Sequence, residues 1–223
     1  MDEGRLREAL VAAGARLGAR GLIAAGEGNA SIRLDEGRLL ITPSGRRKDE
    51  LSPAHLVVVS ARGVGTEAAG TGPRPSSDVA IHRAIYAARP DVGAIVHAHI
   101  PAAMALTVAG EAPDPAALPE TALFLPRLPV VPLAAPGSDE LAAAIAAVLA
   151  AGAPKPGAVL LERHGAVAVG DGEDREAAVA QAVDRIELID VLCRVWRDAL
   201  LIRAARRDDT GRAGSDRRHE EGR

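Results

Sequence analysis

The chain has 223 residues, of which 48% are hydrophobic and 26% charged, with a formal net charge of −3. This length and composition fit one globular domain with a sizeable core. The charge leaves no broad basic surface for nucleic acid, and aromatic residues, at 1% of the chain, offer no platform on which bases could stack. A single cysteine, Cys193, excludes an internal disulfide framework and fits a reducing compartment.

Nothing in the sequence predicts a membrane partner. The most apolar stretch, residues 141–151, is alanine-rich and too short to span a bilayer. Residues 1–5 lack the basic start and apolar region of a signal peptide. We therefore expect a cytoplasmic protein.

The first half of the chain alternates between helical and extended patterns. Leu6, Leu10 and Leu17 recur at helical spacing. Residues 35–37 turn the chain between two apolar runs, which predicts a β-hairpin. The serines before Asp78 provide an N-cap for the next helix. The expected elements are a helix over residues 3–20, hairpin strands over 31–34 and 38–41, a strand over 56–59, a glycine-rich surface loop over 61–72 and a helix over 77–88.

The second half continues the alternation. The expected elements are a strand over 93–99, a helix over 101–108, a proline-rich extended connection over 110–136 with a short strand at 128–131, a helix over 138–151, strands over 158–161 and 166–169, and a helix over 173–205. Interleaved strands and helices predict the α/β class, with helices on both faces of one sheet. Residues 206–223 alternate charges with Gly and Ser, so we expect one domain over 1–205 followed by a disordered tail.

Two histidines, His97 and His99, stand at the end of an apolar run. Side chains alternate along a strand, so both imidazoles emerge on the same face. They supply part of a catalytic zinc site, which takes about three protein ligands and keeps an open position. His164, at another strand end and followed by Gly165, provides a third. Taken alone, His164 is equally well explained as a residue that hydrogen-bonds the backbone of its own turn.

The remaining histidines have plainer explanations. His55 lies in a surface turn and His219 lies in the tail. His82 follows Asp78 by four residues, on the same helical face, which is typical of a residue that packs in the core or supports a site residue from behind.

Small polar residues gather in three loops. Asp78 lies in the first turn of a helix, where the dipole favours its ionised form. Ser76 and Ser77 beside it present hydroxyl and N–H groups that attract phosphate or carboxylate. On its own, this Ser-Ser-Asp run is explained by a helix cap. Together with residues 28–31 and 44–45, it describes loops able to surround an anion.

Over residues 3–200 these motifs, in this order, resemble the class II sugar-phosphate aldolases of the L-fuculose-1-phosphate type. Relatives of that family include ribulose-5-phosphate 4-epimerases, a methylthioribulose-phosphate dehydratase and the adducin head domain. The matching motifs are Gly28-Asn29-Ala30-Ser31, Ile41-Thr42-Pro43-Ser44-Gly45, Ser76-Ser77-Asp78, Arg89-Pro90-Asp91-Val92, Val96-His97-Ala98-His99 and His164-Gly165.

The resemblance implies a three-layer α/β/α fold with a central mixed, largely antiparallel sheet, assembled as a homotetramer with sites between subunits. It implies Zn2+, or another divalent metal such as Mn2+ or Co2+, on His97, His99 and His164. Asp78 would be a fourth ligand or the catalytic acid/base. The substrate phosphate would bind to Asn29, Ser44, Gly45, Ser76 and Ser77.

Three residues or stretches depart from the family pattern. Asp78 replaces the usual glutamate, which sets the carboxylate back by about 1 Å. The threonine expected just before Gly28 is missing, and Glu27 there would repel a phosphate unless it turned to solvent or met an arginine such as Arg46 or Arg47. Residues 118–124 contain no tyrosine to match the one that a neighbouring subunit lends in those aldolases.

The activity that the resemblance implies is zinc-dependent cleavage of a sugar phosphate, such as L-fuculose 1-phosphate, to dihydroxyacetone phosphate and an aldehyde through an enediolate. A related metal-dependent epimerase, dehydratase or decarboxylase is the alternative within the family. A non-catalytic, adducin-like scaffold is the alternative outside enzymes. A Schiff-base aldolase needs a buried lysine. Lys48 and Lys155, the two lysines of the chain, both lie in polar loop stretches, which argues against it.

Overall fold

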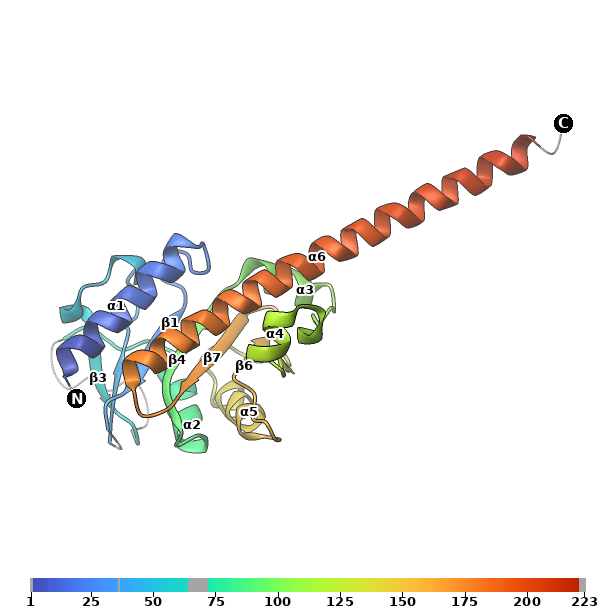
Figure 1. Cartoon of the computed structure of the whole chain (residues 1–223). Coiled ribbons are helices and arrows are strands. Elements are labelled where there is room, and N and C mark those ends of the chain that lie inside the picture. Colours follow the sequence, from blue (N-terminus) through green and yellow to red (C-terminus); the bar gives the residue numbers. More distant parts are fainter. Residues whose placement is uncertain (1, 36, 64–71, 221–223) are drawn as a thin grey trace.

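The computed structural model describes residues 2–35, 37–63 and 72–220, with side chains to residue 207, so most of the expected loop over 61–72 lies outside the described residues. Its strands are β1 Asn29–Arg33, β2 Arg38–Ile41, β3 Val57–Ser60, β4 Val92–Ala98, β5 Val130–Val131, β6 Ala158–Leu161 and β7 Gly165–Asp171. They form one seven-stranded sheet of order β3-β2-β1-β4-β7-β6-β5 (Figure 1). Only β5 and β6 pair in parallel, which confirms the mixed, largely antiparallel sheet.

Helices cover both faces of this sheet, as predicted. They are α1 Glu3–Ala19, α2 Val79–Ala88, α3 Pro101–Val108, α4 Pro119–Phe124, α5 Asp139–Ala150 and α6 Arg175–Glu220. One core joins α1, α3 and α6 to one face, and a second core joins α2 and α5 to the other. Residues of β4 alternate between the cores, so Val96 faces α6 while Ile95 and His97 turn toward α2.

Small residues on β7 let α6 lie directly against the sheet. A Cβ on Gly170 would stand 1.8 Å from the carbonyl oxygen of Ala178 in α6. Ala166 and Ala168 face the same core. With almost no aromatic side chains to fill the core, the helix and the sheet therefore pack close together.

The proline-rich connection is less extended than predicted. It contains the expected short strand, β5, but also the helix α4. Pro119 stands in the first turn of α4, where its missing N–H has no intrahelical partner to lose. This proline therefore begins a helix instead of preventing one.

Helix α6 also runs further than the expected end near residue 205. It continues to Glu220 and projects beyond the body of the molecule (Figure 1). No proline follows Pro156, so the sequence holds no strong helix breaker there. The last described α6 side chain that packs against the core is Leu200, and Leu201 and Ile202 are exposed. The boundary at residue 205 between the domain and a disordered tail stays a prediction. None of the helices in the described part of the chain combines the length and apolar character that a bilayer crossing requires.

Candidate active site

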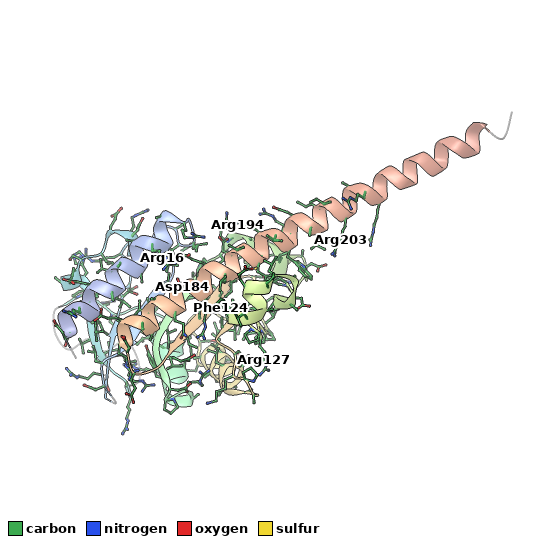
Figure 2. The ribbon with its side chains drawn as sticks, viewed as in Figure 1. Arg16, Phe124, Arg127, Asp184, Arg194 and Arg203 are labelled. Atoms are coloured by element: carbon green, nitrogen blue, oxygen red, sulfur yellow. The ribbon has the colours of Figure 1, made fainter. Side chains whose placement is uncertain are left out.

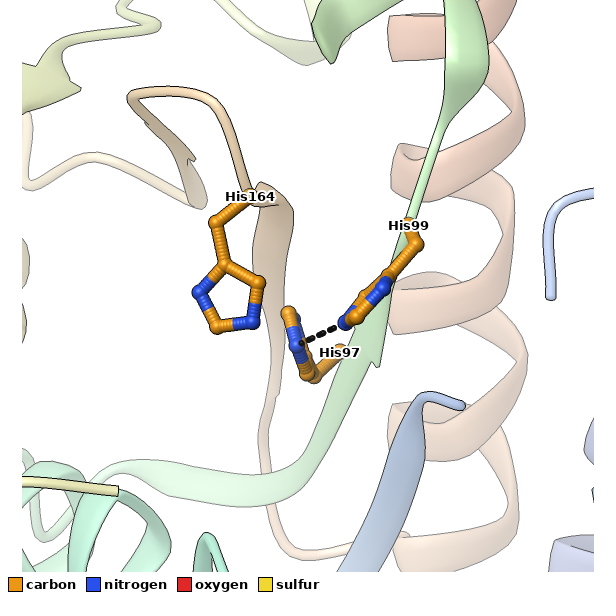
Figure 3. Close-up of side chains that lie close together, drawn as sticks. All are labelled: His97, His99 and His164. Carbon is orange, nitrogen blue, oxygen red and sulfur yellow. Dashed lines mark hydrogen bonds between the residues drawn. The ribbon is translucent and has the colours of Figure 1, made fainter. Parts of the chain in front are cut away.

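Three histidine side chains converge where strands in the middle of the sheet end (Figure 3). His97 lies near the end of β4, His99 just beyond it, and His164 in the turn between β6 and β7. Their ring centroids are 4.8 to 4.9 Å apart. One ring nitrogen of each lies within 4.8 Å of the others. The three imidazoles, which come from separate positions in the sequence, therefore lie close enough together to bind one ion.

Gly165 makes this convergence sterically possible. Its φ of +136° is a conformation that L side chains rarely adopt. A Cβ there would stand 2.2 Å from the carbonyl oxygen of Ala98 and 3.0 Å from the Cα of His99. Glycine therefore lets the turn that carries His164 lie directly against the end of β4.

We expect Gly165→Ala to lower the free energy of unfolding by about 3 kcal/mol, since it adds a clash with backbone to the conformational strain. Zinc binding should weaken in the same variant, because the turn that carries His164 must move. Gly172→Ala is the matched control: its φ is +105°, but no atom lies within 4 Å of an added Cβ. It should cost only about 1 kcal/mol. Urea unfolding and metal titration of both variants measure the difference, and equal losses would contradict the steric argument.

The histidine nitrogens are arranged as metal ligands are. Nδ1 of His97 donates to the carbonyl oxygen of Ala166 at 2.9 Å, which leaves the lone pair of Nε2 free. Nε2 of His99 lies 3.0 Å from that atom. Burial, and then the neighbouring histidines, lower the pKa of His97 to about 3. Burial and His99 also lower the pKa of His164. The free nitrogen of His97, facing Nε2 of His99 with a ligand atom of His164 within 4.8 Å, fits a divalent cation such as zinc.

Glu27 lies beside this cluster. Its Oε1 is 3.6 Å from Nδ1 of His99, on the side of the ring away from His97. Neither arginine proposed from the sequence meets it, because Arg46 faces His55 and Arg47 pairs with acidic residues of its own turn. A carboxylate at the outer nitrogen of a metal-binding histidine orients the ring and raises its basicity.

The polar loops form a single pocket of about 210 Å³ next to His99 and His164. Of the residues predicted to bind phosphate, those that line it are Asn29, Ser44, Ser76 and Ser77. Gly45 is not among the lining residues; its φ of +70° shapes the loop behind Ser44. A larger groove of about 620 Å³ lies elsewhere, between α4 and α6 near Phe124 and Asp184 (Figure 2), and it contains no histidine.

The Asp78 carboxylate turns into this pocket. Asp78 directly precedes α2, but its side chain makes no capping hydrogen bond. Instead, Oδ2 accepts a hydrogen bond from Nδ2 of Asn29 at 2.8 Å. A helix cap therefore does not account for this carboxylate. Asp78 also lies outside the cluster of ligand atoms that the three histidines form, which favours a role as acid or base over that of a fourth ligand.

A buried chain of hydrogen bonds fixes the amide of Asn29. Because its Nδ2 donates to Asp78, its Oδ1 accepts, here from Nε2 of His82 at 2.6 Å. Nδ1 of His82 lies 2.6 Å from the hydroxyl of Ser31, which lies 3.0 Å from that of Tyr86. Burial lowers the pKa of His82 to about 4, so the ring is neutral at pH 7. His82, on the helical face of Asp78 as expected, thus orients the amide that holds Asp78, and Ser31 and Tyr86 complete the chain behind it.

Lys48 is buried, so the expectation that its polar loop stretch leaves it exposed is wrong. The residue is only 3% exposed, and its Nζ donates to the carbonyl oxygens of Gly26 and Arg46 at 2.8 Å each. Helix α1 covers it: a Cβ on Gly14 would stand 2.2 Å from the Lys48 carbonyl oxygen. Lys48 lines the pocket, whereas the Lys155 side chain is 47% exposed. No periodicity in the local sequence reveals this, because the burial comes from a distant helix.

Comparisons with known proteins give a consistent result. The model of the Class II Aldolase and Adducin N-terminal domain family matches residues 8–197. The chain is 33% identical over 198 residues to a 3-oxo-tetronate 4-phosphate decarboxylase of Cupriavidus necator, covering 87% of this chain and 84% of that one. It is 37% identical over 181 residues to a methylthioribulose-1-phosphate dehydratase of Acidiphilium cryptum, with coverages of 77% and 82%.

A solved structure agrees with the sequence relatives. The crystal structure of l-fuculose-1-phosphate aldolase from Thermus thermophilus is similar with a TM-score of 0.78 and 31% identity, covering 90% of this chain and 97% of that one. The names of these three proteins describe three different reactions, all with phosphorylated compounds.

Proposed function

Because this chain belongs to the class II aldolase and adducin family, we propose that it is a metal-dependent enzyme that breaks a bond near the carbonyl group of a sugar phosphate. Aldol cleavage to dihydroxyacetone phosphate and an aldehyde, as for L-fuculose 1-phosphate, is the first candidate. The observation that carries the proposal is the convergence of His97, His99 and His164 beside a polar pocket. A non-catalytic scaffold would have no need of three clustered imidazoles.

Each group has a distinct proposed role. A divalent cation, with zinc the first choice, would act as a Lewis acid and stabilise the negative charge of the enediolate. The Asp78 carboxylate, held by Asn29, moves a proton to or from the reacting carbon. Ser44, Ser76 and Ser77 bind the phosphate, the last two at the N-terminal end of α2.

Decarboxylation of a 3-oxo sugar-acid phosphate is a second candidate, and the missing tyrosine favours it. Loss of CO2 leaves an enediolate without removal of a proton from a substrate hydroxyl, so it needs one acid/base group fewer. Tyr86 is the only tyrosine of the chain and is 3% exposed, so no copy of this chain has one to lend to a neighbour. Burial also raises the pKa of the Tyr86 hydroxyl. The relative from Cupriavidus necator carries this activity in its name.

A product panel tests the proposal. The zinc-loaded protein is incubated with L-fuculose 1-phosphate, 3-oxo-tetronate 4-phosphate and methylthioribulose 1-phosphate. Dihydroxyacetone phosphate marks aldol cleavage, released CO2 marks decarboxylation, and a loss of water from the organic product marks dehydration. We expect turnover of one of them that a chelator abolishes and zinc restores. No turnover of these or other ketose phosphates by protein with one bound zinc would favour the scaffold.

The assembly and the location are part of the same proposal. The family resemblance implies a homotetramer, which light scattering of the purified protein measures directly. The single cysteine is buried and burial raises its pKa, which fits a cytoplasmic protein with no disulfide to form.

A further inference from the structure

Lys48 has one hydrogen-bond donor without a partner. An ammonium group has three N–H bonds. Two of them go to the carbonyl oxygens of Gly26 and Arg46, and within the described part of the chain the third has no acceptor. The side chain is almost fully buried, yet it lines the pocket that contains Ser44 and Ser76. The unpartnered donor is therefore available to a ligand in that pocket and to little else.

The charge of this lysine is not balanced by a direct ion pair. No carboxylate of the described residues lies within 4.0 Å of its nitrogen; Asp78 acts on it only from a longer distance. Burial lowers the pKa of Lys48, whereas Asp78 and the two carbonyl oxygens, which only accept hydrogen bonds, favour the protonated form. A buried cation without a close counter-ion is costly to desolvate. An anion that enters the pocket would remove that cost.

The pocket needs such a cation. Glu27 and Asp78 both line it, and Lys48 is the only lysine or arginine among the described residues that do so. The divalent cation proposed on the histidines would bind the reacting end of the substrate. At the phosphate end, hydroxyl groups and the N-terminal end of α2 supply donors, but no full positive charge. A phosphate dianion among two carboxylates would otherwise be repelled.

We propose that the free N–H of Lys48 binds the phosphate group of the substrate and makes the pocket selective for phosphorylated ligands. This rests on the proposed function, since it concerns the same pocket. The two carbonyl bonds hold the ammonium where the loop of Gly26 meets the loop of Arg46, so its position does not depend on the ligand. The same bonds argue against a Schiff base, which needs a neutral amine that is free to attack a carbonyl.

The experiment compares Lys48→Met with Lys155→Met, the matched control at the only other lysine. Inorganic phosphate is titrated by calorimetry into the zinc-loaded full chain. We expect Lys48→Met to weaken phosphate binding by about 10- to 100-fold, as for loss of a hydrogen bond to a charged group. Lys155→Met should leave it unchanged, and both variants should keep one zinc. Any phosphate bound directly to zinc contributes equally in all of them.

Three results would overturn the inference: no phosphate binding by the native protein, unchanged affinity in Lys48→Met, or covalent trapping of a ketose phosphate on Lys48 by borohydride. If Lys48→Met does not fold, native protein with 13C-labelled lysine decides the question. Phosphate should then shift the Lys48 signal and not that of Lys155, which Lys155→Met assigns. Phosphate binding does not require turnover. An inactive protein that binds phosphate through Lys48 would therefore contradict only the proposed function, and an active one that ignores Lys48 only this inference.

Discussion

His97→Ala should abolish both zinc binding and turnover. His97 is 2% exposed, and its ring centroid lies 4.8 and 4.9 Å from those of His99 and His164, with Nε2 only 3.0 Å from Nε2 of His99. Its removal leaves two ligands, below the about three that hold a catalytic zinc. Since a Lewis acid is worth several kcal/mol to the reaction, turnover should fall by roughly 1000-fold or more. Metal analysis and an activity assay on the same preparation measure both effects.

His55→Ala is the matched control for that variant. His55 lies in a short turn, where its Nδ1 accepts from the backbone N–H of Ser52, and it is not part of the histidine cluster. Its loss should leave zinc content and turnover at native levels. Full activity in His97→Ala would reject the metal centre, even if the fold and the family assignment stood.

The sheet and the three histidines could be predicted because short-range patterns specify them. Alternation along β4 separates Val96 from His97, and the strand end places His99 beside it. The turn between β6 and β7 is marked by Gly165, whose backbone no other residue would readily adopt. No local pattern in the sequence reveals the register of β4 against β7, and this register brings His164 close to His97 and His99. Only the position of His164 at a strand end, and the third ligand that zinc requires, point to it in the sequence.

The buried lysine and the hydrogen-bond chain beside the site could not be predicted, since long-range packing creates them. Lys48 is buried because α1 lies on its backbone at Gly14, more than thirty residues away along the chain. The link from His82 to Asn29 joins a helix to a strand on the other side of Asp78 in the sequence. Helical spacing puts His82 on the face of Asp78, but only the fold shows that both of them meet the same amide.

Asp78→Asn should lower kcat by about 100- to 10,000-fold, the range expected when a general acid or base is lost. The amide keeps the size of the side chain and an oxygen that can accept from Nδ2 of Asn29, but it cannot exchange a proton with the substrate. Zinc content should not change, because Asp78 lies outside the histidine cluster. Steady-state kinetics and metal analysis of the purified variant measure the two quantities separately.

Asp78→Glu separates the charge of this residue from its position. The longer side chain restores a carboxylate but moves it by about 1 Å, and a shift of that size can cost on the order of 100-fold in rate. We therefore expect a kcat between those of the native protein and Asp78→Asn, with zinc retained in all three. If Asp78→Asn loses zinc together with activity, Asp78 is a metal ligand and not the acid/base. If it keeps native turnover, the proton must be carried by another group, and Glu27, 3.6 Å from His99 in the same pocket, is the carboxylate to replace next.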